Sequence, residues 1–303
     1  MIKLFKQDRK NVALALSSGG ARGLVHIGAI DALEARGYRI TSIAGTSMGA
    51  LVAGMYASGH LEDFKQWMLS IDRKRVRELT DFSFGLSYVV KGERIIEALK
   101  QFAPDVNIED LPIPYCAVAT DWTTGREVLF TRGSLYRAIR ASISVPAVFE
   151  PVRFNDHILI DGGITDPIPV DKVHRGKDDL LVAVNVSGHN YDGIHEREKL
   201  AEELQKKKSR ALSLIFKILP EDTHPTFNYY TLINRSISIA ITHNAHRALR
   251  LCPPDILVDL PMKRYGGNDY DKYPQLHRIG AQKMNRAIDS FLAGKSISIR
   301  LPF

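Results

Sequence analysis

The stretch "LALSSGGARGLVHIG" (Leu14–Gly28) combines the end of an apolar strand, a turn of small residues and the start of a helix. The strand pattern covers Val12–Leu16, and the helical pattern begins at Leu24. A glycine-rich turn at the N-terminus of a helix directs backbone N–H groups toward negative charge. The stretch therefore predicts an anion-binding turn. It leaves open whether the anion is a stable phosphate or a charge that forms only during a reaction.

Strand and helix patterns alternate after this unit. A strand pattern at Arg39–Gly45 precedes the helical stretch "MGALVAGMYASG" (48–59). This β-α-β-α order predicts a parallel sheet with right-handed crossovers. Further strand patterns cover Tyr115–Trp122, Glu127–Gly133 and "LLVAVNVSG" (180–188), whose continuous apolar run is typical of a strand buried on both faces. We therefore predict an α/β fold with a mainly parallel sheet flanked by helices.

The chain from 191 to 251 has a different pattern. "EREKLAEELQKKKSRALSLIFKILP" (196–220) is broadly amphipathic and helical, and a second helical pattern covers Thr231–Leu249. Another strand and a C-terminal helix follow. We predict one α/β domain formed by residues 11–190 and 252–293, with 191–251 as a helical insertion that serves as a lid or an interface segment.

The composition is that of an ordinary globular protein, with 303 residues, 45% hydrophobic and 25% charged. The formal net charge of +7 suits either lipid headgroups or nucleic acid, and charge alone does not choose between them. No nucleic-acid-binding module accompanies the charge, so we expect no nucleic-acid partner. Cys116 and Cys252 form neither a disulfide framework nor a metal-binding spacing, and we expect no metal.

The apolar segments are too short for membrane insertion or export. The run Val12–Leu16 falls short of the roughly 7–15 apolar residues that a signal peptide needs. No unbroken apolar stretch approaches the roughly 20 residues of a membrane span. We predict a cytoplasmic protein.

The motif "GTSMG" (Gly45–Gly49) fits G-x-S-x-G, the pattern of a nucleophile elbow. In such an elbow a serine stands on a sharp turn between a strand and a helix, and side chains at Gly45 and Gly49 would collide with that turn. The helix that begins after Ser47 directs its first N–H groups toward the reacting oxygen. Because the motif lies between a predicted strand and a predicted helix, Ser47 is the predicted nucleophile.

A serine that attacks an ester needs hydrogen-bond donors for the developing oxyanion, each worth about 10²–10³ in rate. Candidate donors are the backbone N–H groups of five residues: Gly20, Ala21, Arg22, Gly23 and Met48. The rival interpretation is a dinucleotide-binding turn. However, Ser18 occupies the place of its first glycine, no acidic residue follows about 20 positions later, and the G-K-[ST] of a P-loop is missing. The sequence favours a transient oxyanion.

No histidine stands in a stretch that marks it as the base of a triad. His26 lies on a predicted helix, where a packing role is the commoner one. His157 is an alternative partner, because it lies four residues before Asp161 and shares its face in a regular strand. Asp161 itself, in "IDGGITDPIPV" (160–170), stands at the end of a predicted strand, where active sites of parallel sheets gather.

Taken together, these motifs resemble the patatin-like phospholipase family. The glycine turn Gly19–Gly23, then Ser47, then Asp161 follow in the family's order, and the likeness includes "GREVLFTRGSLYRAIRASISVPAVFEPV" (125–152). It covers about residues 11–187, and Ser18 departs from it where many members carry glycine. The resemblance implies a Ser-Asp dyad without histidine. Ser47 is then the nucleophile, Asp161 accepts its proton and the glycine turn forms the oxyanion hole.

The resemblance further implies a lipid acyl hydrolase of the phospholipase A or lysophospholipase type, with an acyl-lipid substrate and no cofactor or metal. An acyltransferase with the same dyad and a non-catalytic, membrane-associated regulatory protein are the alternatives. The helical pattern 196–219, with Lys206–Lys208 beside "LSLIF", suits peripheral contact with an anionic membrane surface on the inner face of the membrane. Packing on the domain or in a dimer fits it equally well. The sequence does not indicate the oligomeric state.

Overall fold

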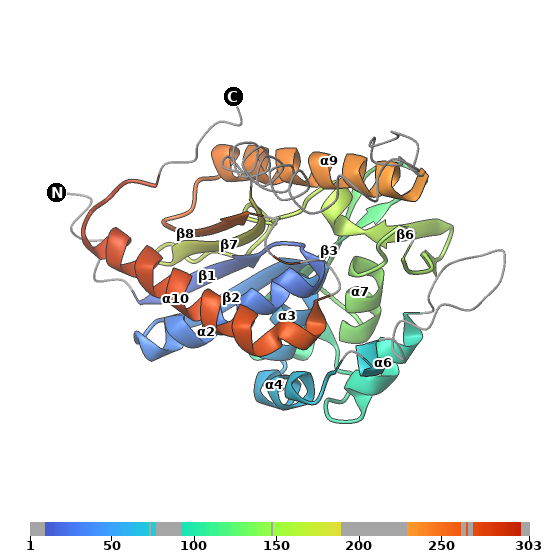
Figure 1. The fold of residues 1–303 in the computed structure, drawn as a ribbon, viewed down its shortest axis with the longest axis horizontal. Helices are drawn as coiled ribbons and strands as arrows, with labels where there is room; N and C mark the ends of the chain where they lie inside the picture. Colours follow the sequence, from blue (N-terminus) through green and yellow to red (C-terminus); the bar gives the residue numbers. More distant parts are fainter. Residues whose placement is uncertain are drawn as a thin grey trace, which may run out of the picture.

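The computed structural model describes residues 10–72, 74–76, 92–146, 148–188, 229–261, 265 and 269–297, and for 229–234 only the backbone. Within these residues an eight-stranded sheet has the order β5-β6-β3-β2-β1-β7-β8, and β4 also pairs with β3 (Figure 1). The strands are β1 (Asn11–Leu16), β2 (Arg39–Thr46), β3 (Tyr115–Asp121), β4 (Glu127–Phe130), β5 (Val152–Phe154), β6 (His157–Asp161), β7 (Leu180–Gly188) and β8 (Ile256–Pro261).

The central strands are parallel, as predicted. β1 pairs in parallel with β2 and β7, β2 with β3, and β7 with β8. The three remaining strands, β4, β5 and β6, join the sheet in antiparallel pairs. β3 and β7 are buried along their whole length, which explains why each begins with a continuous apolar run, 115–119 in β3 and 180–184 in β7, rather than an alternating pattern.

Helices cover both faces of the sheet. They are α2 (Val25–Ala35), α3 (Met48–Ala57), α4 (Leu61–Leu69), α6 (Glu93–Lys100), α7 (Leu135–Ser142), α9 (Tyr229–Leu251) and α10 (Tyr273–Leu292). Short 3-10 helices are η1 (Gly20–Leu24), η2 (Ile108–Asp110), η3 (Gly162–Ile164) and η5 (Tyr270–Lys272). The helix predicted from Leu24 begins at Val25, because the glycine turn before it closes as the 3-10 helix η1.

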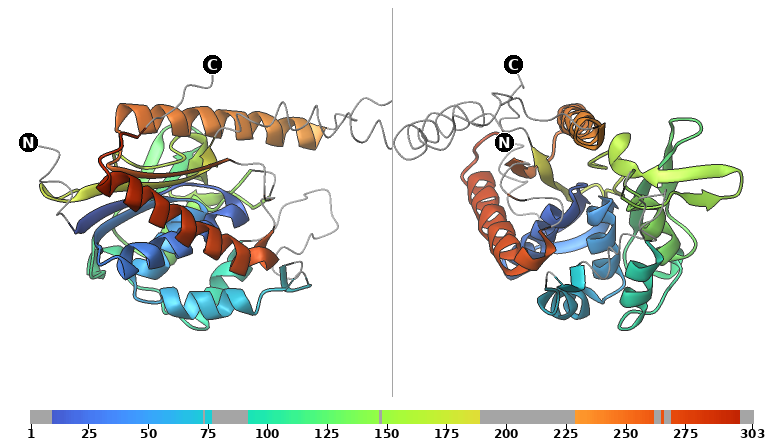
Figure 2. Two further views of the ribbon diagram at one scale, coloured as in Figure 1. Left: turned by 60° about the vertical axis from the view of Figure 1, so that its left-hand side comes forward. Right: turned by 45° about the vertical axis from the view of Figure 1, so that its right-hand side comes forward.

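Alternate residues of β1 show the two layers. Val12, Leu14 and Leu16 belong to the main core, which α2, α3 and α10 complete. Ala13 and Ala15 pack in a smaller cluster with residues of α9. Figure 2 shows α9 on one side of the sheet and α10 on the other. The small side chains of the second cluster let α9 approach the sheet closely.

The predicted insertion falls partly within this helical layer. The second helix predicted there, Thr231–Leu249, is the observed α9, which contacts β7 and η3. The Asn244 side-chain amide also donates to the carbonyl of Ile164, at 3.0 Å. The first predicted helix, 196–219, with its proposed membrane contact, lies outside the described residues, and the lid or interface role stays a prediction. No helix within the described ranges combines the length and hydropathy needed to cross a bilayer.

Candidate active site

β2 and β6 bring Ser47 and Asp161 together at one edge of β3. In β2, Thr46 lies opposite Val118 of β3, and in β6 Asp161 lies opposite the next residue, Ala119. β4 pairs with β3 over the same positions. Since β4 takes one edge of β3, β2 and β6 must share the other edge and meet end to end. Ser47, the first residue after β2, therefore lies next to Asp161.

Ser47 has a strained backbone. Its φ of 57° makes it one of two non-glycine residues with positive φ in the described part of the chain. Such a conformation costs on the order of 1–3 kcal/mol and persists only where the surroundings impose it. A Cβ added at Gly45 would lie 2.3 Å from the backbone of Gly49, and one at Gly49 would lie 2.3 Å from the carbonyl oxygen of Leu16. The two glycines thus allow the turn on which Ser47 stands.

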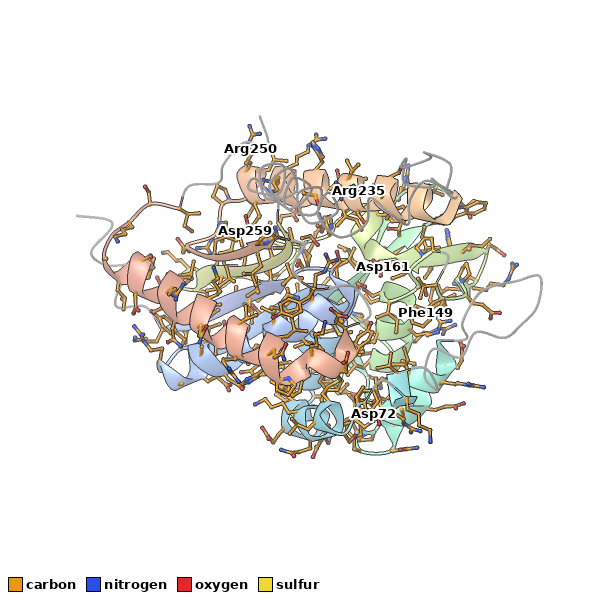
Figure 3. All side chains as sticks on the ribbon, viewed as in Figure 1. Asp72, Phe149, Asp161, Arg235, Arg250 and Asp259 are labelled. Carbon is orange, nitrogen blue, oxygen red and sulfur yellow. The ribbon has the colours of Figure 1, made fainter. Side chains whose placement is uncertain are left out.

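Asp161 is buried, and its backbone and one carboxyl oxygen are fixed. Its Oδ1 accepts a hydrogen bond from the N–H of Gly163 at 2.7 Å, and its carbonyl accepts one from the Thr120 hydroxyl at 3.0 Å. A Cβ at Gly162 would lie 2.2 Å from the carbonyl oxygen of Val118. Gly162 therefore lets this loop lie directly on β3, while Gly163 lies against the Asp161 carboxyl and Ser18. Figure 3 locates Asp161 in the molecule.

The carboxyl group of Asp161 interacts with the Ser47 hydroxyl. Oδ2 is buried and has no hydrogen bond of normal geometry within the described residues. The pKa of Asp161 is raised from 3.8 to about 6. Burial causes the rise, and interactions with the Ser47 hydroxyl and the Gly163 N–H partly oppose it. Contacts between a nucleophile and its base are often longer than ordinary hydrogen bonds before substrate binds. The carboxylate is thus a stronger base than an exposed aspartate and has one oxygen available for a proton.

The glycine turn lies against the first residue of α3. A Cβ at Gly23 would lie 2.4 Å from Cγ of Met48, so η1 and the start of α3 are in contact. The first N–H groups of a helix have no acceptor within the helix. Gly20 and Met48 line one pocket together with Ser47, whereas Ala21, Arg22 and Gly23 do not line it. Of the five predicted donors, Gly20 and Met48 are therefore the two that share this pocket with Ser47.

The Arg22 side chain folds back onto its own turn. Its Nε donates to the carbonyl of Gly19 at 3.0 Å, and burial lowers its pKa to about 10. Burial and the charge of Asp161 raise the pKa of Tyr270 to about 12, while Arg22 opposes this rise. Tyr270, in η5, lies in the lining of the same pocket as Ser47. No local pattern in the sequence indicates this residue.

The pocket next to Ser47 is apolar. Its cavity volume is about 90 Å³. Its walls come from α3, α4, α6 and the segment after α7, with side chains that include Leu51, Phe64, Trp67, Met68, Ile95 and Phe149. Figure 3 locates Phe149. A serine at one end of an apolar pocket fits an extended hydrocarbon group with a polar reacting end.

Neither histidine considered above faces Ser47. His26 is fully buried, its Nε2 lies 2.8 Å from the carbonyl oxygen of Ser17, and burial lowers its pKa to about 4. It is therefore neutral and acts as a structural hydrogen-bonding group. Nδ1 of His157 lies 2.9 Å from Oδ2 of Asp121, which makes Asp121 its carboxylate partner instead of Asp161.

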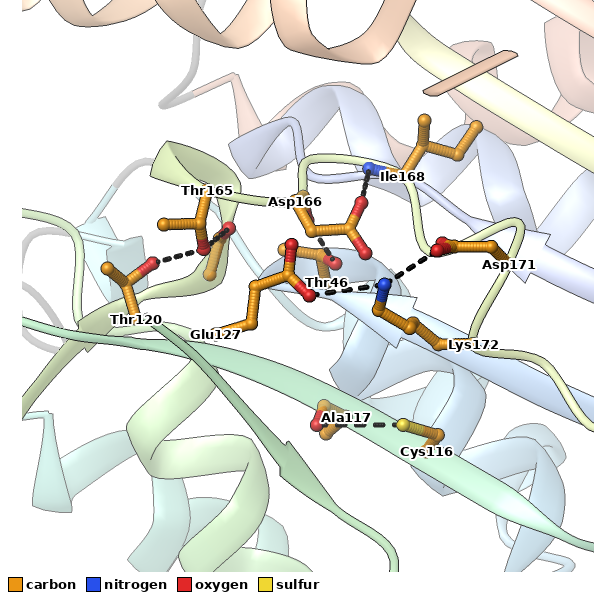
Figure 4. A network of polar contacts seen from close by, with 11 residues as sticks. Thr46, Cys116, Ala117, Thr120, Glu127, Thr165, Asp166, Ile168, Asp171 and Lys172 are labelled. Carbon is orange, nitrogen blue, oxygen red and sulfur yellow. Dashed lines mark hydrogen bonds and ion pairs between the residues drawn. The ribbon is translucent and has the colours of Figure 1, made fainter. Parts of the chain in front are cut away.

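A second acid follows Asp161 in the same loop. The backbone carbonyl of Asp166 accepts a hydrogen bond from the Thr46 hydroxyl at 2.9 Å (Figure 4). Burial, reinforced by the charges of two neighbouring carboxylates, raises the pKa of Asp166 to about 7. Lys172 pairs with those carboxylates, Glu127 at 3.2 Å and Asp171 at 2.6 Å. In the described ranges, no group of three or more His, Cys, Asp and Glu residues is placed to hold a metal ion.

Comparisons with known proteins give a family model, curated relatives and a solved structure. Residues 14–174 match the family model described as "Patatin-like phospholipase". An "Uncharacterized NTE family protein" of Mycobacterium tuberculosis (strain ATCC 25618 / H37Rv) is 32% identical over 330 residues, which cover 92% of this chain and 92% of that protein. VipD from Legionella pneumophila, a solved structure, shares 15% identity with a TM-score of 0.48 over 94% of this chain and 67% of that chain.

Two fungal relatives are much longer than this chain. "Lysophospholipase NTE1" of Candida glabrata is 28% identical over 282 residues, which cover 89% of this chain and 16% of that protein. The protein of the same name in Saccharomyces cerevisiae is 27% identical over 279 residues, with coverage of 89% and 16%. The similarity to these two proteins therefore concerns a small part of their length.

Proposed function

The chain belongs to the patatin-like phospholipase family, and on this premise we propose that it hydrolyses the acyl esters of lipids with Ser47 as nucleophile and Asp161 as proton acceptor. The observation that carries the proposal is the end-to-end meeting of β2 and β6 on β3. It sets a serine on a strained turn beside a buried carboxylate with one unpaired oxygen, next to an apolar pocket.

The reaction follows from these positions. Ser47 Oγ attacks the ester carbonyl carbon while Asp161 takes the hydroxyl proton. The N–H groups of Gly20 and Met48 stabilise the oxyanion. The tetrahedral intermediate collapses, the alcohol leaves with the proton from Asp161, and the acyl group stays on Ser47. Water, deprotonated by Asp161, then attacks the acyl-enzyme. The second tetrahedral intermediate collapses, Ser47 Oγ leaves and takes the proton back from Asp161, and the fatty acid is released.

The pocket favours a lipid with a single acyl chain. In the described part of the chain, α3, α4 and α6 wall an apolar pocket that Ser47 also lines, and a single acyl chain bound there extends away from the reacting carbonyl. Two relatives carry the name lysophospholipase, which denotes action on a single-chain phospholipid. We accordingly propose monoacyl phospholipids as the preferred substrates.

The proposal is tested by measuring fatty-acid release from monoacyl and diacyl phospholipids of short, medium and long chain, by mass spectrometry. We expect faster release from monoacyl lipids and a preference for long chains, because each buried methylene contributes about 0.8 kcal/mol. A fluorophosphonate probe should label the protein, and peptide mapping should place the adduct on Ser47. An adduct on a different residue, or lipid release by protein that takes up no probe, would reject the assignment. Added glycerol or another acceptor alcohol measures acyl transfer in the same assay.

The activity should depend on pH through Asp161. The carboxyl must be ionised to accept a proton, and its pKa lies at about 6. We expect kcat/KM for a soluble short-chain ester to rise about tenfold per pH unit below that value and to level off above it. Initial rates in buffers of constant ionic strength measure the profile. A profile that stays level through this range would contradict the role of Asp161 as base.

A further inference from the structure

We infer that the end of α7 and the residues after it, 140–144, position both members of the proposed dyad, and that the Ser142 hydroxyl holds the backbone of the nucleophile. This inference rests on the proposed function. The segment lies in the stretch "RAIRASISVPAVFEPV" (137–152), to which the mechanism above assigns no role. Each contact involves a buried group, and two of them reach the backbone of Ser47 and Asp161 directly.

The first contact fixes Ser47. Its backbone N–H donates to Oγ of Ser142 at 2.8 Å, and the Ser142 hydroxyl donates to the carbonyl of Val118 at 2.6 Å. Ser142 is fully buried. Its hydroxyl thus links the strained turn to β3 and leaves neither the N–H nor the carbonyl unpaired. The N–H of Ser47 is directed to Ser142, so the oxyanion must be stabilised by other donors, among which Met48 is the next along the chain.

The second contact fixes Asp161. Its backbone N–H donates to the carbonyl of Ser144 at 2.9 Å. Ser142, which holds Ser47, and Ser144, which holds Asp161, are separated by a single residue, Ile143. The distance between nucleophile and base is therefore set by α7 as well as by β3. Misplacement of reacting groups by about 1 Å can cost about 10²-fold in rate.

The Arg140 side chain stabilises the segment through three polar contacts. This side chain is 8% exposed. Nη1 donates to the Ser144 hydroxyl at 2.7 Å, and Nη2 donates to the carbonyl of Glu150 at 3.0 Å. Nε pairs with Glu93 of α6 at 3.2 Å. Because Ile143, Val145 and Phe149 also line the apolar pocket, the same part of the chain connects the pocket wall to the dyad.

Ser142→Ala tests the inference. The substitution removes the acceptor of the Ser47 N–H and leaves that buried group unpaired. We expect the rate of labelling by a fluorophosphonate, and kcat for a soluble ester, to fall about 10- to 100-fold. KM should stay within about threefold, because the pocket side chains are unchanged. Ser142→Thr retains the hydroxyl and should restore most of the rate.

Ser42→Ala is the matched control. Ser42 is also buried, also donates its hydroxyl to a backbone carbonyl, that of His174, and lies on β2 far from Ser47 along the strand. We expect this variant to react at the wild-type rate within about threefold. Thermal unfolding of each variant distinguishes a protein that does not fold from a folded protein in which Ser47 is misplaced. If Ser142→Ala does not fold, Ser142→Cys retains the volume with a weak acceptor and should show the same slow labelling.

Three results would overturn the inference: wild-type labelling by Ser142→Ala, equal slowing in Ser42→Ala, or a rise in KM with unchanged kcat. Each of these leaves the proposed function intact, since wild-type protein still reacts at Ser47. Wild-type protein that takes up no probe at Ser47 makes the proposed function wrong, and the inference with it. The labelling of wild-type protein therefore distinguishes the two failures.

Discussion

Ser47→Ala is expected to lower kcat/KM for ester hydrolysis by at least about 10⁴-fold, because the variant has no oxygen to form the acyl-enzyme. The residual rate would come from the oxyanion donors and from binding in the apolar pocket. Alanine at position 47 retains the positive φ imposed by the surrounding turn. The fold should therefore persist, with an unfolding temperature within a few degrees of the wild-type value. Steady-state kinetics with a chromogenic ester and thermal unfolding measure both effects.

Ser58→Ala provides the control for this loss. Ser58 follows the same helix, α3, at its other end, and its hydroxyl donates only to the carbonyl of Met55. Its replacement should leave kcat/KM within about twofold of wild type, since surface substitutions usually change stability by about 0.5 kcal/mol or less. If Ser47→Ala retained a hundredth or more of the wild-type activity, a different residue would have to be the nucleophile.

Asp161→Asn is expected to lower kcat by about 10³- to 10⁴-fold, near the upper end of the contribution of a general base. Asparagine has nearly the same shape, and its Oδ1 still accepts the hydrogen bond of Gly163. Its amide nitrogen, however, takes the place of Oδ2 and cannot accept the proton of Ser47. The pH dependence near the pKa of about 6 should vanish with the carboxyl. Rates measured above and below that pH show both changes.

The same substitution should stabilise the protein. The pKa of Asp161 is raised from 3.8 to about 6 in the folded state, so between these values the folded chain binds more protons than the unfolded chain. Stability is then lost as the pH rises through this window. Above it the buried charge costs about 3 kcal/mol, which asparagine avoids. Denaturant unfolding should show Asp161→Asn to be more stable than wild type at neutral pH. This gain in the free energy of unfolding should shrink as the pH falls toward 4.

Asp166→Asn separates the effect on activity from the effect on stability. Asp166 is also a buried acid with a raised pKa, about 7, in the same loop. Its replacement should likewise raise the free energy of unfolding at neutral pH. Activity should remain within about threefold of wild type, because its interactions are with Thr46 and Ile168 and not with Ser47. A loss of activity as large as that of Asp161→Asn would contradict the choice of Asp161 as the base.

Local sequence determines much of the fold. β7 is buried on both faces, so its apolar run from Leu180 is continuous and its position was predictable. The helix predicted at Thr231–Leu249 forms as Tyr229–Leu251, and the mainly parallel α/β fold is confirmed. The turn around Ser47 was predictable for a different reason. A Cβ at Gly45 or Gly49 would clash with backbone atoms. Glycine is therefore required at both positions, and the sequence motif reveals the turn.

The pairing of strands was not accessible from local patterns. The local sequences around Thr46 and Asp161 do not indicate that both residues pair with neighbouring residues of β3, because this pairing depends on the arrangement of the whole sheet. The same holds for Tyr270, which reaches the pocket from far along the chain, and for Ser142, which looks like any small helical residue. The four-residue spacing of His157 and Asp161 indicated a shared face, but the aspartate that His157 meets is Asp121.

The position of β1 also has a consequence for synthesis of the chain. β1 lies between β2, which follows it closely, and β7, which begins only at Leu180. A nascent chain emerges from its N-terminus, so one edge of an apolar strand stays unpaired while most of the domain is still being translated. Such edges template association between chains, and distant strand pairs form slowly. We therefore expect a nascent chain that ends before β7, with β1 open on one side, to be more prone to aggregation and to capture by chaperones than the complete domain.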